Sequence, residues 1–210
     1  MPVRWCVLAA IILAAGESSR MGRPKALLPD SGGRPFVVRL AGTFATAGVP
    51  NIIVVVGSHT AAAISGVLDT ASLRVAPTVV TNPDPARGQV SSLWIGLDEA
   101  ERVGAEAVLV TLVDIPMVAV ATVDRVLGAW QEQRAPIVRP AFRGRHGHPV
   151  LFDRSVFPEL RNAPLDEGAR AVVHAHAEDI RNVDVDDEGC VTDVDTPEDY
   201  DKLIRGRGAC

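Results

Sequence analysis

The sequence has few aromatic residues, few cysteines and a deficit of positive charge, and each shortage argues against a class of function. Aromatic residues make up 4% of the 210 residues, which leaves little for binding nucleic acid by base stacking. The net charge of −5 argues against a polyanionic partner such as DNA. The three cysteines, Cys6, Cys190 and Cys210, are too few and too widely spaced for a disulfide framework or a zinc site.

The placement of the cysteines favours a reducing compartment. Cys190 follows Gly189 in an expected turn and Cys210 ends the sequence, so we interpret both as free surface thiols, which fits the cytoplasm.

Residues 5–15 are eleven apolar residues after Arg4, a pattern that resembles the apolar core of a signal peptide. The run is too short to span a bilayer. Cleavage near Ala15 would also separate it from the loop that follows, so we interpret the run as a retained strand.

Apolar runs suited to buried strands alternate with segments of helical spacing along a chain that is 47% hydrophobic. Strands are expected at 11–14, 52–56, 78–81, 107–112, 137–139, 150–152 and 180–185, and helices at 36–47, 60–68, 90–102, 120–133, 156–160, 169–177 and 196–204. A turn is expected at 186–189. This alternation predicts one domain over residues 1–210, a three-layer α/β/α fold with a mostly parallel, Rossmann-like sheet.

The segment 13–29, LAAGESSRMGRPKALLP, is the most informative part of the sequence. An apolar run ends at Gly16, and the loop after it carries Arg20, Arg23 and Lys25. Such a loop offers backbone N–H groups and cations to a triphosphate. Five residues separate Gly16 from Gly22, whereas a P-loop has four between its glycines, and the dinucleotide fingerprint G-x-G-x-x-G is absent. A basic loop on an acidic protein favours a small anionic ligand.

This loop resembles the opening motif of the sugar-nucleotide and cofactor nucleotidyltransferases, and most of all the branch that attaches CMP or GMP to molybdopterin. The resemblance implies the nucleotide-diphospho-sugar transferase fold, with a nucleotide-binding part over about residues 1–140 and an acceptor-binding part over about 141–195. It implies that Arg20 and Lys25 hold the triphosphate and that Lys25 neutralises charge as pyrophosphate leaves. The nucleotide-binding residues of the loop would be Leu13, Ala14, Ala15, Gly16, Arg20, Gly22 and Lys25.

Two acidic motifs are candidates for a magnesium site. Asp114 comes just after a buried strand, where a carboxylate suits Mg²⁺ bound to substrate phosphates but is also common in a plain turn or helix cap. If Val194 is buried in an extended segment, Asp193 and Asp195 share the opposite face. The resemblance assigns the metal to Asp114 and Asp195, with Asp193 the poorer candidate. Because ligands bind beyond the carboxyl ends of parallel strands, we expect Gly16 and Asp114 to meet in one crevice.

Two further segments resemble ligand-binding parts of the same family. Asn82 and Ser92 lie in Thr-Asn-Pro and Gly-Gln-Val-Ser-Ser-Leu segments that suit contact with the base or ribose, although serines at a helix start are also ordinary caps. His148 and Arg170 lie in Gly-His-Pro and Gly-Ala-Arg segments that would face the acceptor. His146 and His148 lack the further ligands that zinc requires. The segment before Gly-Ala-Arg departs from the family pattern, so the identity of the acceptor molecule stays open.

The resemblance implies a Mg²⁺-dependent nucleotidyltransferase in which Arg20, Lys25 and Asp114 are catalytic. The acceptor's phosphate would attack the α-phosphate of CTP or GTP, and the acceptor would be molybdopterin, with a molybdenum enzyme receiving the product. No nucleic acid or membrane partner is expected. Leu-Ala-Ala-Gly is more similar to the cytidylyl branch than to the guanylyl branch. Three alternatives stay open: another phosphorylated acceptor, a non-catalytic escort of a nucleotide-bearing cofactor, and a reductase using NADH or NADPH.

Overall fold

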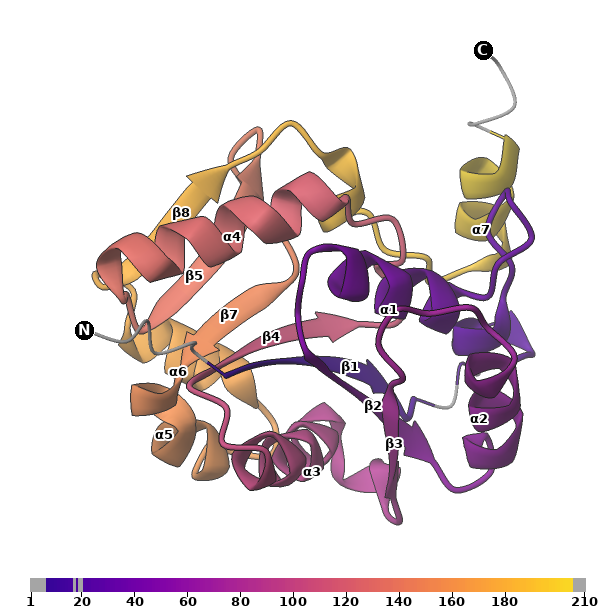
Figure 1. The fold of residues 1–210 in the computed structure, drawn as a ribbon, viewed down its shortest axis with the longest axis horizontal. Helices are drawn as coiled ribbons and strands as arrows, with labels where there is room; N and C mark the ends of the chain where they lie inside the picture. Colours follow the sequence, from indigo (N-terminus) through magenta and orange to yellow (C-terminus); the bar gives the residue numbers. More distant parts are fainter. Residues whose placement is uncertain (1–6, 17, 19–20, 206–210) are drawn as a thin grey trace.

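A single mixed sheet organises the computed structural model, which describes residues 7–16, 18 and 21–205 (Figure 1). Its strand order is β3-β2-β1-β4-β7-β5-β6, and β8 pairs with β5. Within the described ranges the strands are β1 (Leu8–Ala14), β2 (Asn51–Gly57), β3 (Thr78–Asn82), β4 (Ala107–Leu112), β5 (Ile137–Phe142), β6 (Arg145–His146), β7 (Val150–Asp153) and β8 (Ile180–Asp184).

The sheet is mostly parallel. β1 pairs in parallel with β2 and with β4, β2 with β3, and β5 with β8. β7 runs antiparallel between β4 and β5, and the short β6 runs antiparallel to β5. The strands β5 to β8, which come from residues beyond 136, therefore extend the same sheet that the first part of the chain begins.

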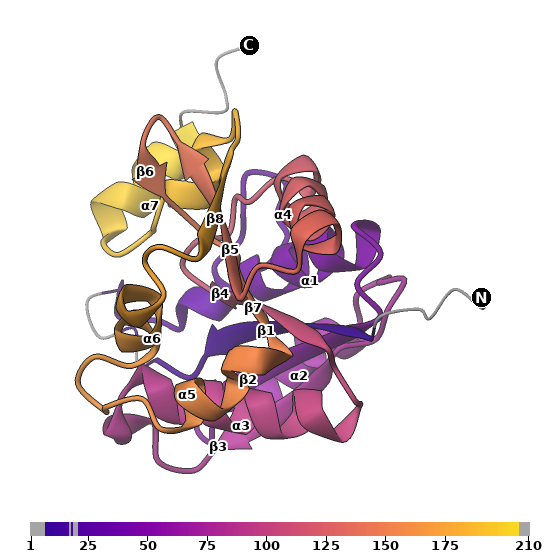
Figure 2. The same cartoon turned by 90° about the vertical axis from the view of Figure 1, so that its left-hand side faces the viewer.

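Helices cover both faces of the sheet, as the views in Figures 1 and 2 show. On one face pack α1 (Phe36–Thr46), α2 (Ala61–Asp69) and α4 (Val120–Gln133), and on the other pack α3 (Gln89–Arg102), α5 (Phe157–Arg161) and α6 (Ala169–Ala175). α7 (Pro197–Arg205) ends the described chain, and short 3-10 helices are η2 (Lys25–Leu27), η3 (Pro85–Arg87), η4 (Arg154–Val156) and η5 (Glu188–Val191).

The sequence of β1 shows why the central strands are uninterrupted apolar runs. Alternate side chains point to opposite faces of a strand. Leu8, Ala10, Ile12 and Ala14 belong to the core beneath α1, α2 and α4, and Ala9, Ile11 and Leu13 to the core beneath α3, α5 and α6. Because helices cover both faces, every position of β1 is buried, which confirms the predicted three-layer α/β/α architecture.

The predicted elements are confirmed with small shifts at their ends. β4 and α4 have the predicted bounds, and most other elements differ by one to three residues. β6, which is only two residues long, is not among the predicted strands. The expected helix at 156–160 begins two residues earlier, as η4, and the expected turn at 186–189 continues into η5.

The prediction that Cys190 is a surface thiol is wrong. Cys190 is buried with no exposed area, because η5 packs beneath the loop that joins β6 to β7. The peptide N–H of His148 donates to the carbonyl oxygen of Cys190 at 2.8 Å. Burial, and then the negative charge of Asp187, raise the pKa of the thiol to about 11. Cys6 and Cys210 lie outside the described residues.

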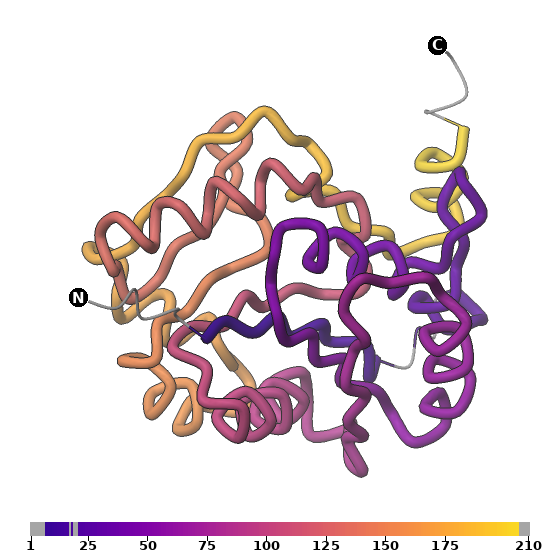
Figure 3. Tube along the Cα trace, viewed as in Figure 1, coloured from indigo at the N-terminus to yellow at the C-terminus, as the bar shows by residue number. Residues whose placement is uncertain are grey.

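α7 lies beside the segment that follows β1, although about 170 residues separate them in the sequence (Figure 3). The hydroxyl of Tyr200 donates to the carbonyl oxygen of Pro29 at 2.8 Å. The Tyr200 ring lies 6.1 Å from the ring of Phe36, and the Arg23 guanidinium lies 5.4 Å from the Tyr200 ring. In the described part of the chain, no helix combines the length and the apolar character needed to cross a membrane.

The close packing of α3 on the sheet makes a testable prediction about Gly96. A Cβ at this position would lie 2.6 Å from Cγ2 of the fully buried Ile11. We expect Gly96→Ala to destabilise the protein by about 1–3 kcal/mol, because the core must shift to accept the methyl group. Gly128→Ala in α4 is the matched control, since nothing lies within 4 Å of its Cβ position.

Urea unfolding of the two variants measures the difference. In the control, alanine improves helix propensity, and stability is expected to rise by about 0.5–1 kcal/mol. Equal effects of the two substitutions would show that α3 does not pack as closely as described.

Candidate functional site

The site lies where β1 and β4 end side by side. The two strands are neighbours in register up to Leu13 and Leu112. Just beyond, the Val113 N–H donates to the carbonyl oxygen of Leu13 at 3.1 Å. The two loops that leave this edge carry the most informative sequence motifs, and both line one cavity of about 240 Å³.

This cavity, called the first cavity below, brings together charged side chains from distant parts of the chain. Three of its described lining residues are charged. The lining consists of Leu13, Ala15, Gly16, Ser18, Lys25, Pro85, Gly88, Gln89, Ser92, Leu112, Val113, Asp114 and Asp195.

Lys25 lies between the two carboxylates. Its Nζ is 3.0 Å from Oδ2 of Asp114 and 2.5 Å from Oδ1 of Asp195. The Lys25 side chain is 11% exposed, and those of Asp114 and Asp195 are 22% and 33% exposed. Burial acts to lower the lysine pKa, but the hydrogen bonds and charges of Asp195 and Asp114 outweigh it, and the pKa is raised. The ammonium is therefore charged at neutral pH.

The local backbone holds Lys25 in place. Ser18 adopts a positive φ of 52°, and its hydroxyl accepts a hydrogen bond from the Lys25 peptide N–H at 3.0 Å. Met21 N–H donates to the Ser18 carbonyl oxygen at 2.9 Å. The loop is thus closed on itself around Ser18, which presents the lysine side chain to the carboxylates.

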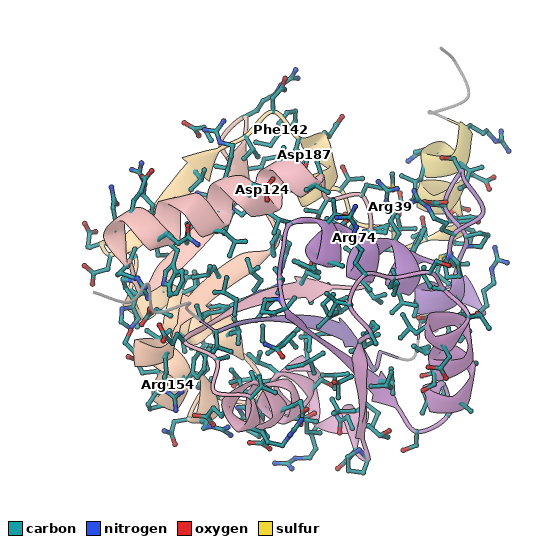
Figure 4. The ribbon with its side chains drawn as sticks, viewed as in Figure 1. Arg39, Arg74, Asp124, Phe142, Arg154 and Asp187 are labelled. Atoms are coloured by element: carbon teal, nitrogen blue, oxygen red, sulfur yellow. The ribbon has the colours of Figure 1, made fainter. Side chains whose placement is uncertain are left out.

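Asp195 is positioned by the chain segment just before it. Val194 is buried, and its N–H donates to the Asp114 carbonyl oxygen at 2.8 Å, so the backbones of the two acidic motifs are joined directly. Upstream, Asp187 (labelled in Figure 4) accepts hydrogen bonds from Ala119 N–H at 2.9 Å and from the Thr122 hydroxyl at 2.7 Å. These bonds fix η5 against the start of α4.

Asp30 and Arg39 brace the opposite side of the same loops. The Asp30 side chain is 2% exposed and accepts hydrogen bonds from the peptide N–H groups of Gly32 and Arg34. Arg39 (Figure 4) lies 3.2 Å from Asp30 and donates through Nε to the Pro116 carbonyl oxygen at 3.0 Å. Arg39 thereby connects the end of the first loop to the turn that carries Asp114.

The oxygens of Asp114 fit a metal ion. Oδ2 is paired with Lys25, whereas Oδ1 is buried and has no hydrogen-bond partner among the described residues. An unpartnered buried carboxylate oxygen is costly unless something else binds it. Carboxylate oxygens are the ligands that Mg²⁺ and Mn²⁺ prefer. Asp114 and Asp195 therefore have the chemistry that suits a divalent cation.

Asn82 lies behind the cavity wall. It is 1% exposed, and its amide nitrogen donates to the hydroxyls of Ser91 and Ser92, each at 2.9 Å. Its side-chain oxygen accepts from Asp84 N–H at 2.9 Å. Ser92 lines the first cavity. Asn82 thus orients the Ser92 side chain by a hydrogen bond. Of these two residues, Ser92 is the one that lines the cavity.

A larger hollow of about 600 Å³, the second cavity, adjoins the first. The two share Leu13, Gly88, Gln89 and Leu112. Apolar side chains such as Val110 form part of its wall. Its other described lining residues include the charged or titratable Arg139, His146, His148, Asp166, Glu167, Arg170 and His174. A ligand in the second cavity can thus lie close to one in the first.

His148 is a neutral hydrogen-bonding group in the second cavity. Its Nδ1 lies 3.3 Å from the carbonyl oxygen of Val110, an acceptor, so this nitrogen carries the proton and Nε2 is left as an acceptor. Burial lowers the pKa of His148, against the smaller opposing effects of Val110 and of the Asp114 charge. The ring is therefore uncharged at pH 7.

The structure brings together most of the residues that the sequence singled out. Leu13, Ala15, Gly16, Lys25, Ser92, Asp114 and Asp195 line the first cavity, and His148 and Arg170 the second. Ala14 and Gly22 line neither cavity, and Arg20 lies outside the described residues. Asp193 is exposed and lines another hollow, beside Met117 and Thr192.

Some lining residues were missed. Gln89 belongs to the Gly-Gln-Val-Ser-Ser-Leu segment, and its place at the start of the predicted helix is a signal that could have identified it. No sequence signal identifies Ser18 or Arg139 as lining residues. The positive φ of Ser18 and the position of Arg139 between paired strands arise only in the folded chain.

The family of the chain follows from its similarity to known proteins. Residues 10–180 match the MobA-like NTP transferase domain. The chain belongs to this family. The match ends before Asp195, so Asp195 is assigned to the site by the structure rather than by the family match.

The names of similar proteins give different activities. The chain is 32% identical to the nicotine blue oxidoreductase of Paenarthrobacter nicotinovorans, over 95% of this chain and 97% of the relative. It is 31% identical to the molybdenum cofactor guanylyltransferase of Rhodobacter capsulatus, over 79% and 83%. It is 25% identical to the molybdenum cofactor cytidylyltransferase of Escherichia coli K12, over 90% and 92%.

Solved structures agree on the fold. Rv0371c of Mycobacterium tuberculosis H37Rv superposes with a TM-score of 0.76 at 30% identity, covering 95% of this chain and 98% of that one. Its complex with manganese gives a TM-score of 0.71 at 29% identity, covering 95% and 98%. A nucleotidyl transferase from Methanothermobacter gives 0.73 at 23% identity, covering 96% and 99%. The fold is therefore that of the nucleotide-diphospho-sugar transferases, as the sequence predicted.

The buried position of Asp30 makes a prediction about pH. Burial raises its pKa, but the peptide N–H bonds from Arg34 and Gly32, the charge of Arg34 and the side-chain hydrogen bond from Arg39 together outweigh burial, and the pKa is lowered from the ordinary 3.8. We expect Asp30→Asn to cost about 1–3 kcal/mol at pH 7, since charged hydrogen bonds are lost. Because the pKa of Asp30 is lower in the folded state than in the unfolded chain, this stabilisation is fully present above pH 3.8 and is lost as pH falls from there through the folded-state pKa.

Urea unfolding between pH 7 and pH 3 measures the effect. Asp124→Asn, on the exposed side of α4 (Figure 4), is the control and should stay within about 0.5 kcal/mol of the wild type. A deficit in Asp30→Asn that stays constant down to pH 3 would contradict the assigned role.

Proposed function

We propose that the protein transfers CMP or GMP from CTP or GTP to a phosphorylated acceptor, of the molybdopterin type, with release of pyrophosphate. The observation that carries the proposal is the cluster of Lys25, Asp114 and Asp195 at the adjoining ends of β1 and β4. A cation and two carboxylates in one cavity suit a substrate that is a metal-bound polyphosphate.

The reaction needs positioning and charge neutralisation rather than a covalent enzyme intermediate. An oxygen of the acceptor's phosphate attacks the α-phosphorus, the bond from that phosphorus to the α–β bridging oxygen breaks, and pyrophosphate leaves with its negative charge. We assign the triphosphate to the first cavity, where Lys25 binds its oxygens and Ser92 offers a hydroxyl. Arg20, which lies outside the described residues, keeps its proposed role of holding the triphosphate.

Mg²⁺ is the proposed metal. Asp114 and Asp195 would hold it, and when bound it would neutralise charge on the phosphate oxygens. Support comes from the unpartnered Oδ1 of Asp114 and from the manganese complex of the similar Rv0371c.

The acceptor is assigned to the second cavity. Its volume of about 600 Å³ suits a ring system, and Arg170 and Arg139 suit a phosphate. Neutral His148, with Nε2 as an acceptor, suits an N–H or O–H donor on the acceptor molecule. The resemblance to the two molybdenum cofactor transferases favours molybdopterin over a sugar phosphate.

One observation favours a second candidate, a reductase using NADH or NADPH. The relative at 32% identity is named an oxidoreductase, and the second cavity is large enough for a flat organic substrate. The carboxylate pair supports the transferase instead, since hydride transfer does not require it. Oxidation of NADPH with nicotine blue as acceptor, followed at 340 nm without Mg²⁺, tests this second candidate.

The transferase makes a direct prediction about Asp114. Asp114→Asn should lower the rate of pyrophosphate release from CTP or GTP, with molybdopterin and Mg²⁺ present, at least about 100-fold, because several kcal/mol of charge stabilisation is lost. A coupled pyrophosphate assay measures the rate, and circular dichroism checks that the variant is folded.

Asp193→Asn is the matched control. It removes a neighbouring carboxylate that lies outside the first cavity, so activity should remain. Equal activity of the Asp114 and Asp193 variants would disprove the role of Asp114.

A further inference from the structure

We propose that Lys25 makes the Asp114–Asp195 pair selective for a divalent cation that arrives together with a polyphosphate, and that it weakens binding of the free cation. The inference rests on the proposed function, because it takes these two carboxylates as the metal ligands.

The ammonium and the metal compete for the same negative charge. Nζ of Lys25 contacts one oxygen of each carboxylate, at 3.0 Å and 2.5 Å. A dication that bridges the two carboxylates must replace the ammonium between them. A dication on Oδ1 of Asp114 alone still lies a few ångströms from the ammonium, and like charges that close repel each other.

A displaced ammonium finds no other charged partner among the described residues of the cavity wall. Among the described residues that line the first cavity, Lys25, Asp114 and Asp195 are the charged ones. The lysine side chain is only 11% exposed, so water solvates it poorly. Binding of a free metal ion therefore leaves a buried, unpaired positive charge, which is costly.

A polyphosphate removes this cost because it brings its own negative oxygens. The lysine stem is flexible, and its backbone N–H is held by the Ser18 hydroxyl at 3.0 Å. The head group can thus turn from the carboxylates to a phosphate while the backbone stays in place. Metal and polyphosphate then each improve the binding of the other, and this coupling is reciprocal.

Titration with Mn²⁺ alone tests the first half of the proposal, with free Mn²⁺ measured by electron paramagnetic resonance and no nucleotide present. Lys25→Met removes the charge and keeps much of the shape, and we expect it to bind free Mn²⁺ at least about 10-fold tighter than the wild type. Lys25→Arg keeps the charge and should show no such gain. The double variant K25M/D114N should lose the gain.

Titration with preformed Mn²⁺–tripolyphosphate, by calorimetry, tests the second half. The wild type should bind this complex at least about 10-fold tighter than Mn²⁺ alone, and the ratio should shrink in Lys25→Met. Lys25→Gln serves as a second neutral variant, because its amide keeps hydrogen bonds to the carboxylates if the methionine variant does not fold.

The outcomes separate this inference from the proposed function. If the wild type binds free Mn²⁺ and the neutral variants bind it no tighter, the proposed effect of Lys25 on metal selectivity is wrong, while the assignment of the carboxylates as a metal site stands. If neither the wild type nor the neutral variants bind Mn²⁺, the carboxylates are not a metal site, and the metal assignment of the proposed function fails as well.

Discussion

The ion pairs of Lys25 with Asp114 and Asp195 are the interaction on which the arrangement of the site depends. They join three segments that lie 89 and 170 residues apart in the sequence. Two carboxylates this close repel each other unless a cation lies between them. The lysine pairs with both carboxylates and so stabilises the meeting of the three segments in one cavity. The same requirement makes the cavity suitable for metal-bound phosphates.

The surrounding structure holds the three charged groups in place through bonds to backbone atoms. Ser18 holds the backbone of Lys25, Val194 N–H binds the Asp114 carbonyl, and Asp187 fixes η5 to the start of α4. Arg39 connects Asp30 to Pro116 on the other side. These bonds do not depend on the charge state of the site, so its side chains can change partners while the frame persists.

Much of this could be predicted from the sequence, because apolar runs and strand ends are local signals. The buried run before Gly16 and the Asp-x-Pro after β4 were enough to expect both in one crevice, and both line the first cavity. Tertiary packing decided the rest. Cys190 is buried because η5 passes beneath a distant loop, and Asn82 is turned away from the cavity by hydrogen bonds to two serines. The Lys25 ion pairs were not predicted, since they require three separate loops to fold first.

The relatives of the chain include both a transferase and an oxidoreductase by name, so the chemistry of the first cavity decides between these two activities. Calorimetric titration of the wild-type protein with CTP, GTP and NADPH, each with and without Mg²⁺, separates the two activities. A nucleotidyltransferase should bind one triphosphate with an affinity that depends on Mg²⁺. Binding of NADPH without Mg²⁺, together with no binding of either triphosphate, would contradict the transferase activity.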